Sequence, residues 1–103
     1  MIHHCVWLRF RAEVPRAQRD ALMAEIRALV GQVPGLLEVR AGVNARYEDL
    51  DHGFDEGFMA VFANREGLAA YQAHPAHQAT GARLVAAAQG GLQGLLVFDL
   101  ELP

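Results

Sequence analysis

The fold is decided by the stretch Ile-His-His-Cys-Val-Trp-Leu-Arg-Phe, residues 2–10. Its side chains alternate with the period of a β-strand, which places every second residue on the same side. One side carries Ile2, His4, Val6, Leu8 and Phe10. The other side is also largely apolar, because it carries Cys5 and Trp7. A strand with two apolar sides belongs in a sheet that is covered on both faces.

The segments that follow alternate between helical and strand periods. Pro15 suits the first turn of a helix, and apolar residues at 22, 26, 29 and 33 then recur as one helical stripe. Gly31 and the Pro34-Gly35 pair end this helix. Residues 37–43 alternate as a second strand that contains Gly42, with Leu37, Val39, Ala41 and Val43 on one side.

The second half of the chain repeats this order after a polar segment. Residues 45–55 are acidic and predict a long exposed loop, and residues 58–63 form a third strand that is apolar on both sides. Asn64 is a good N-cap for a short helix that runs to about Ala73. Pro75 interrupts the helical pattern, so a second helix runs from there to about Gln89. Residues 95–102 form the last strand, with Leu96, Phe98, Leu100 and Leu102 on one side.

The resulting order, β-α-β-β-α-β, predicts an α+β, ferredoxin-like fold: a four-stranded antiparallel sheet with both helices on one face. With 103 residues we expect one domain, residues 1–103. Three strands are apolar on both sides, so something must cover the other face, and the simplest cover is a second copy of the same sheet. The sequence therefore predicts a homodimer through the sheet faces, a dimeric α/β barrel.

The composition excludes several classes of protein. Hydrophobic residues make up 52% of the chain and charged residues 20%, which excludes intrinsic disorder. A net charge of −3 argues against nucleic-acid binding. No apolar run approaches the ~18 residues of a membrane span, and we see no secretion signal, so we expect a cytoplasmic protein without membrane contact. The single cysteine, Cys5, excludes an intrachain disulfide and a thiolate-rich metal site.

Several short motifs resemble one known family. They are a first strand that contains His4 and ends in Arg9-Phe10, the turn Val33-Pro34-Gly35, the segment Gly53-Phe54-Asp55, the segment Tyr71-x-x-His74-Pro75-Ala76-His77, and the closing Val97-Phe98-Asp99. Together they resemble the stress-responsive dimeric α/β-barrel family, Dabb, over essentially the whole chain. The Tyr-x-x-His-Pro-x-His segment is the most specific part.

The resemblance implies a homodimer and, for one plant branch, an activity. Those plant proteins cyclise linear polyketides by an aldol condensation without a cofactor, using a Tyr and a His that match Tyr71 and His77. These two are the expected catalytic residues. A further histidine of the plant cyclases is absent, and Glu56 stands near its place. The expected substrate-binding residues are His4, Asn44, Glu56 and His74.

Tyr71 and His77 also suit this chemistry as residue types. A neutral imidazole can take a proton near physiological pH, and a tyrosine hydroxyl can stabilise a developing enolate. Pro75 lies between them, and a helix junction there could aim both groups into one cleft between sheet and helices, gated by the loop at 45–55. In the competing interpretation, Tyr71 packs in the core and His77 bonds a backbone carbonyl.

We expect neither a metal nor a cofactor. His74 and His77 are three residues apart, but His74 precedes a proline, and a third ligand such as His4 or His52 would be needed. The acidic residues at 49–56 are expected to be solvated, with weak Mg²⁺ or Ca²⁺ binding as the alternative.

Three functions are compatible with the sequence. The first is binding of a small carbonyl or aromatic compound, with cyclase-like acid–base chemistry. The second is a non-catalytic, stress-related structural or carrier homodimer. The third rests on fold analogy alone: heme-degrading or quinol-forming monooxygenases use residue types such as Trp7, Asn44 and His77.

Overall fold

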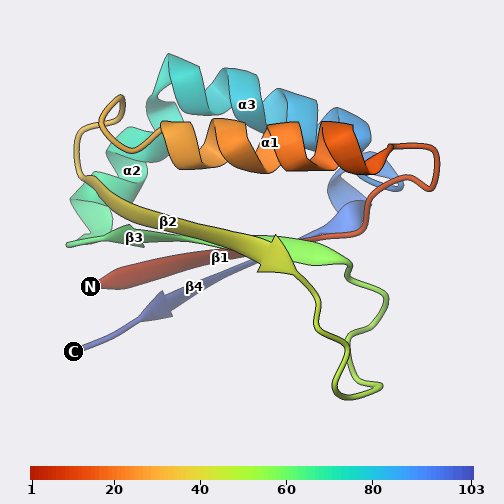
Figure 1. Ribbon diagram of the computed structural model, residues 1–103. Coiled ribbons are helices and arrows are strands. Elements are labelled where there is room, and N and C mark those ends of the chain that lie inside the picture. Colours follow the sequence, from red (N-terminus) through yellow and green to blue (C-terminus); the bar gives the residue numbers. More distant parts are fainter.

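The computed structural model describes residues 1–103 and contains four strands and three α-helices (Figure 1). In chain order these are β1 (Ile2–Leu8), α1 (Arg16–Ala28), β2 (Leu36–Val43), β3 (Glu56–Phe62), α2 (Arg65–Ala73), α3 (Pro75–Ala87), the 3-10 turn η1 (Gly91–Gly94) and β4 (Leu95–Glu101). The predicted ferredoxin-like order is confirmed, with the second helical segment divided into α2 and α3.

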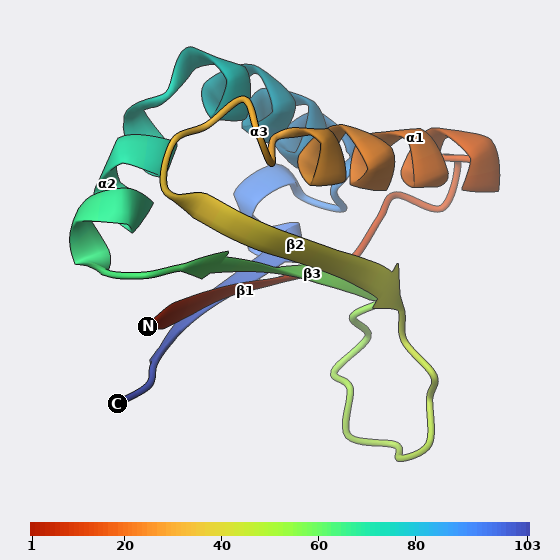
Figure 2. The same ribbon diagram turned by 60° about the vertical axis from the view of Figure 1, so that its left-hand side comes forward.

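The strands form one antiparallel sheet in the order β2-β3-β1-β4. All three α-helices lie over the same face of this sheet, and the opposite face carries no helix (Figures 1 and 2). No helix is both long enough and apolar enough to cross a membrane.

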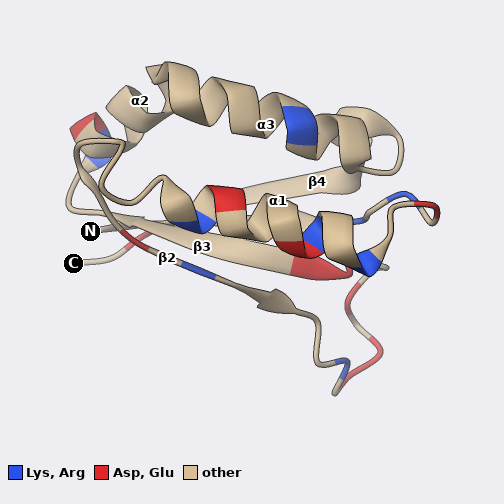
Figure 3. Ribbon diagram, turned by 45° about the horizontal axis from the view of Figure 1, so that its top comes forward, with Lys and Arg blue, Asp and Glu red and all other residues tan.

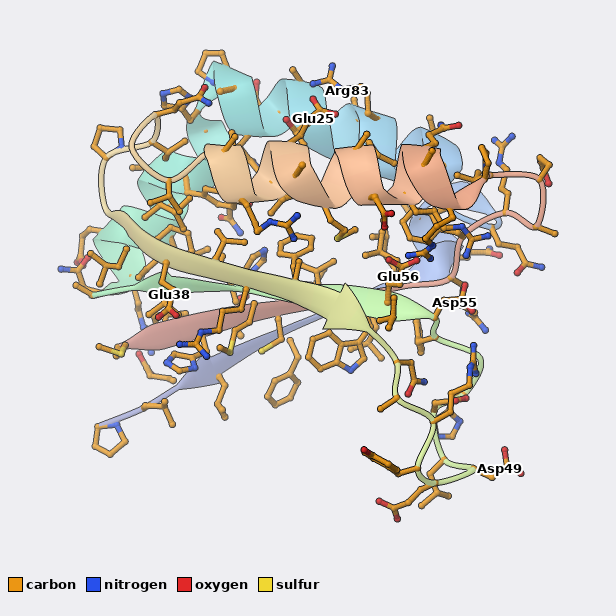
Figure 4. All side chains as sticks on the ribbon, in the orientation of Figure 1. Glu25, Glu38, Asp49, Asp55, Glu56 and Arg83 are labelled. Carbon is orange, nitrogen blue, oxygen red and sulfur yellow. The ribbon has the colours of Figure 1, made fainter.

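The core lies between the helices and the covered face of the sheet. The apolar stripe of α1 and the turns after it is buried there, as predicted from its spacing: Leu22, Ile26, Leu29 and Val33 are each at most 5% exposed. Above this core, Glu25 of α1 forms an ion pair with Arg83 of α3 (Figure 4). The two helices are therefore fixed to each other as well as to the sheet.

The first residues of β2 differ from the prediction. A register shift lies between Leu36 and Glu38, so Leu37 is an extra residue in the strand. Leu36 is consequently the buried residue, and Leu37, which the alternation assigned to the same side as Val39, is exposed. A bulge of this kind adds one residue to the strand, so the residues before it face the opposite side of the sheet from the one that simple alternation predicts.

The face without helices is called the open face here. From the strand registers it consists of His3, Cys5 and Trp7 of β1, Glu38, Arg40 and Gly42 of β2, Gly57, Met59 and Val61 of β3, and Leu96, Phe98 and Leu100 of β4. Its large apolar side chains are unusually exposed, with Phe98 at 58%. Most charged residues lie on α1, the turns and the loop after β2 (Figure 3), and the open face carries the paired Glu38 and Arg40 at its β2 edge. An apolar patch of this kind marks an interaction surface.

The loop 44–55 is called the arm here. It joins β2 to β3 and projects beyond the sheet, away from the helices, with Asp49 near its tip (Figures 1 and 4). The prediction that this loop gates a cleft between sheet and helices is therefore wrong. Its direction was not encoded in its polarity, because an exposed loop can leave the sheet on either side.

The two ends of the chain meet at the opposite end of the sheet (Figure 1). The backbone N–H of Leu102 donates to the carbonyl of Met1 over 2.8 Å. The amino terminus donates in turn to the carbonyl of Leu102 over 3.1 Å.

Candidate functional site

The site is built around the break between α2 and α3. The residue before a proline avoids the helical conformation, and His74 accordingly has φ −72° and ψ 131°. Pro75 occupies the first turn of α3, where its missing N–H is no loss. The Nδ1 of His74 accepts a hydrogen bond from the N–H of Ala76 over 3.1 Å, which caps α3. His74, predicted to bind substrate, is thus engaged as a cap.

This break brings Tyr71 and His77 together. Their ring centroids are 4.0 Å apart, with 35° between the ring planes. Tyr71 is completely buried and also packs against Phe62 at the end of β3, with centroids 5.0 Å apart. The Tyr71 hydroxyl and the Nδ1 of His77 are both buried, and neither has a hydrogen-bond partner in the chain. Since buried polar atoms are nearly always satisfied, two such atoms on neighbouring rings are unusual.

Burial sets the protonation of both rings. It raises the pKa of Tyr71 to about 12, so the hydroxyl keeps its proton at neutral pH. Burial lowers the pKa of His77, with smaller contributions from His4 and His74, and a contact with the Gln72 backbone that falls outside hydrogen-bond geometry opposes this shift. At neutral pH the site therefore holds an uncharged imidazole, which can accept a proton, beside a hydroxyl that can donate one.

His4 is the third group at this site. It lies on the helix-covered side of β1, is buried, and meets Tyr71 edge-on with ring centroids 5.9 Å apart. Its Nδ1 lies 2.5 Å from Oδ1 of Asp99, the residue directly opposite it on β4. A carboxylate at Nδ1 favours a proton on that nitrogen and fixes the orientation of the ring.

Asp99 was not among the predicted site residues. The sequence does contain a signal for it, because alternation along β4 places Asp99 on the opposite side of the sheet from Phe98 and Leu100. What was lacking was the register of β4 against β1, which decides that Asp99 faces His4.

Glu56 and Asn44 lie elsewhere. Glu56 begins β3, whereas Phe62, which contacts Tyr71, ends it; strand geometry separates the two ends by roughly 20 Å. The buried carboxylate of Glu56 is bound by Arg16 of α1, and Arg19 lies 3.9 Å away (Figure 4). Asn44 donates through Nδ2 to Asp51 and to the carbonyl of Phe54 within the arm, each over 2.9 Å. The structure does not bring either residue to Tyr71.

Glu56 gives the fold a testable pH dependence. Burial raises the pKa of Glu56, against the opposing effect of Arg16. A carboxyl group with a raised pKa binds its proton more tightly in the folded chain than in the unfolded one, so its contribution to stability falls as pH rises through that pKa. The ordinary pKa of this carboxyl group is 4.5, and as pH rises above it the melting temperature of the wild type should fall relative to that of Glu56→Gln.

Thermal denaturation of both proteins between pH 4 and pH 7 measures this difference. Glu48→Gln, at an exposed position of the arm, is the matched control and should follow the wild-type curve. Parallel curves for the wild type and Glu56→Gln would contradict the assignment.

The chain has no group of three or more His, Cys, Asp or Glu side chains that could hold a metal ion. In particular, His74 uses its Nδ1 for the helix cap, and His4 uses its Nδ1 toward Asp99.

Comparisons with known proteins place this architecture. The sequence profile of the Stress responsive A/B Barrel Domain family, Dabb, matches residues 2–102. Olivetolic acid cyclase from Cannabis sativa is 25% identical over 80 residues, which is 78% of this chain and 79% of the cyclase. A dimeric ferredoxin-like protein of unknown function from Jannaschia sp. CCS1 is 36% identical, with 98% of each chain covered and a TM-score of 0.90.

A more distant structure shares the fold alone. Hydroxynitrile lyase from Passiflora edulis is 17% identical, with 99% of this chain and 93% of that chain covered and a TM-score of 0.88. The profile match spans nearly all residues, and the strand order agrees with the ferredoxin-like fold of the structural neighbours. The chain belongs to the stress responsive A/B barrel domain family, Dabb.

Proposed function

We propose that the protein is a homodimer that binds a small carbonyl or aromatic compound between sheet and helices and performs cofactor-free acid–base chemistry on it. His77 is the base, Tyr71 the hydrogen-bond donor, and His4 a further polar contact. The observation that carries this proposal is the pair of buried, unpartnered polar atoms on Tyr71 and His77. Each such atom costs about 1–3 kcal/mol if nothing satisfies it.

The dimer forms through the open faces of two copies. Exposed Trp7, Phe98 and their apolar neighbours support this arrangement, since water contact with such a patch is unfavourable. The similar protein from Jannaschia sp. CCS1 is described as dimeric, which supports the same assembly. The site formed by Tyr71, His77 and His4 lies on the helix side of the sheet, so each protomer carries a complete set of these residues.

The chemistry follows from the protonation of the two rings. His77 takes a proton from a carbon next to a substrate carbonyl, and the resulting enolate oxygen accepts a hydrogen bond from the Tyr71 hydroxyl. The enolate carbon then attacks a second carbonyl of the same molecule, which forms a carbon–carbon bond. The new alkoxide takes the proton back from the imidazolium of His77. Base catalysis of this kind supplies typically ~10²–10⁴-fold in rate.

Asp99 is a positioning residue in this scheme. By its contact with Nδ1, it fixes the orientation of the His4 ring beside Tyr71. The similarity to olivetolic acid cyclase supports the reaction class. The resemblance of the Tyr71-x-x-His74-Pro75-Ala76-His77 segment to the motif of the plant cyclases supports the choice of Tyr71 and His77.

A ligand screen with matched variants tests the proposal. The probes are alkyl- and phenyl-substituted β-diketones and aromatic acids, measured by thermal shift with the wild type, His77→Ala and Tyr71→Phe. At a ligand concentration of 100 times Kd, binding to the folded state adds about 2.7 kcal/mol of stability. We expect a shift with the wild type that both variants lose.

Proton abstraction has its own readout. With a bound β-diketone in D₂O, the wild type should exchange the ligand's methylene protons faster than buffer does, as followed by NMR, and His77→Ala should not. This activity should persist below pH 6.5 because burial lowers the pKa of His77. A protein in which no probe binds and His77→Ala melts several degrees lower would instead be the non-catalytic structural dimer.

A further inference from the structure

The arm stands on the side of the sheet that a second copy would occupy. It leaves the sheet at the end of β2 and extends away from the helices, past the level of the open face (Figures 1 and 2). Two sheets that pack face to face lie about 10 Å apart. A partner sheet on the open face would therefore lie beside the arm.

Hydrogen bonds and ion pairs hold the arm in this direction. At its base, Asp55 accepts the N–H of Phe10 over 2.9 Å and donates its own N–H to the carbonyl of Leu8 over 2.8 Å. Across it, Arg46 pairs with Asp51 at 3.0 Å and with Asp55 at 3.2 Å. The Gly53 N–H donates to Asp51 and lowers the pKa of that carboxyl. The arm is thus fixed by its own polar groups, which leaves its apolar ones free.

Arg9 ties the same segment to the sheet. Its guanidinium lies 4.8 Å from the ring centre of Phe54 and donates to the carbonyl of His52 over 3.3 Å and to that of Gln93 over 3.1 Å. The position of the arm is therefore coupled to the strand that crosses the middle of the sheet.

The free apolar groups of the arm point outward. Tyr47 is 94% exposed and Leu50 is 71% exposed, although the loop that carries them is held by hydrogen bonds and ion pairs. Between the arm and the sheet lies a groove of about 580 Å³, to which Leu50 contributes. Its walls include Trp7, Met59 and Leu96, which also belong to the open face. The groove is consequently continuous with the surface through which the dimer forms.

The floor of the groove is shaped for contact. Gly57 lies opposite Trp7, and a Cβ at this position would come within 2.8 Å of the indole Cε3. The glycine lets the indole lie flat across β3 and keeps the groove open beside it.

We propose that the arms of the two copies clasp each other's sheets. The groove of each copy receives the nearest edge of the second copy's sheet, and Tyr47 and Leu50 pack against that edge. The inference rests on the proposed open-face dimer and adds to it a second contact region, which fixes how the two sheets are placed.

The first test is the dissociation constant of the dimer by analytical ultracentrifugation. In Tyr47→Ser/Leu50→Ser the clasp is lost in both copies, so Kd should rise at least about tenfold. Glu48→Ser/Asp49→Ser changes neighbouring exposed side chains of the same arm and should keep Kd near the wild-type value. Circular dichroism checks that all three proteins fold alike, as the high exposure of the substituted residues predicts.

Trypsin cleavage after Arg46 gives a second readout. Cleavage there, relative to cleavage after Arg11 in the turn before α1, should slow as the protein concentration rises through Kd. The clasp would be overturned, and the open-face dimer would remain, if the wild type is a dimer but Tyr47→Ser/Leu50→Ser has the same Kd and cleavage after Arg46 does not change with protein concentration. A wild type that is monomeric at every concentration would overturn both.

Discussion

Phe98→Asp is expected to separate the homodimer into folded monomers. Phe98 lies on the open face of β4 and is 58% exposed in the single chain. Burial of a phenylalanine is worth about 1.5–3 kcal/mol, and the substitution removes it in both copies of a symmetric dimer. Because Phe98 is already partly buried in the single chain, the total is about 3 kcal/mol, which corresponds to a Kd raised by roughly 10²-fold, before the cost of burying two carboxylates is added. Sedimentation over a range of concentrations measures the change.

The matched control is Val30→Asp. Val30 is 41% exposed, a large apolar residue in the turn after α1 and therefore in the helix layer. The same kind of substitution there should leave Kd unchanged. If both variants dimerise like the wild type, the open face is not the interface.

Two substitutions of Tyr71 should move stability in opposite directions. Tyr71→Ala leaves a cavity in the core and should lower the free energy of unfolding by about 3–5 kcal/mol, as for other large buried aromatic residues. Tyr71→Phe keeps the packing against Phe62 and removes a buried hydroxyl without a partner, so it should raise the free energy of unfolding, by about 1 kcal/mol. Chemical denaturation at a fixed protein concentration measures both.

The same pair of variants separates function from packing. Ligand binding and proton exchange should fail in Tyr71→Phe even though that protein is the more stable one. A stability cost in the proposed active site is common, because groups arranged for a ligand are imperfectly satisfied without it. If Tyr71→Phe is instead less stable by 1 kcal/mol or more, the hydroxyl supports the fold and the proposed donor role is wrong.

The sequence predicts most of the fold because its signals are local. The alternation of residues 2–10 gives β1 and its two apolar sides, and the helical stripe ending at Val33 gives the buried face of α1. The break at His74 and Pro75 is equally local, since the proline restricts the residue before it. It was therefore possible to expect Tyr71 and His77 on two sides of one junction.

What the sequence did not predict depends on pairing between distant segments. The bulge at Leu37 exists only relative to β3, and Asp99 faces His4 only in the register that β4 adopts. Glu56 is expected to bind substrate from its position in the family pattern, but the pairing of its carboxylate with Arg16 of another element could not be predicted. Side-chain partners of this kind are decided by tertiary structure, which no single motif encodes.

The paired ends of the chain make the protein almost a closed ring. Because Met1 and Leu102 are hydrogen-bonded neighbours, a short flexible linker could join them without disturbing the sheet. New ends could then be opened at the tip of the arm, between Glu48 and Asp49, where the side chains are exposed. Such a circular permutant would keep every strand pairing while it cuts the arm in two. It would thus separate the contribution of the sheet and helices to the fold from the contribution of the arm.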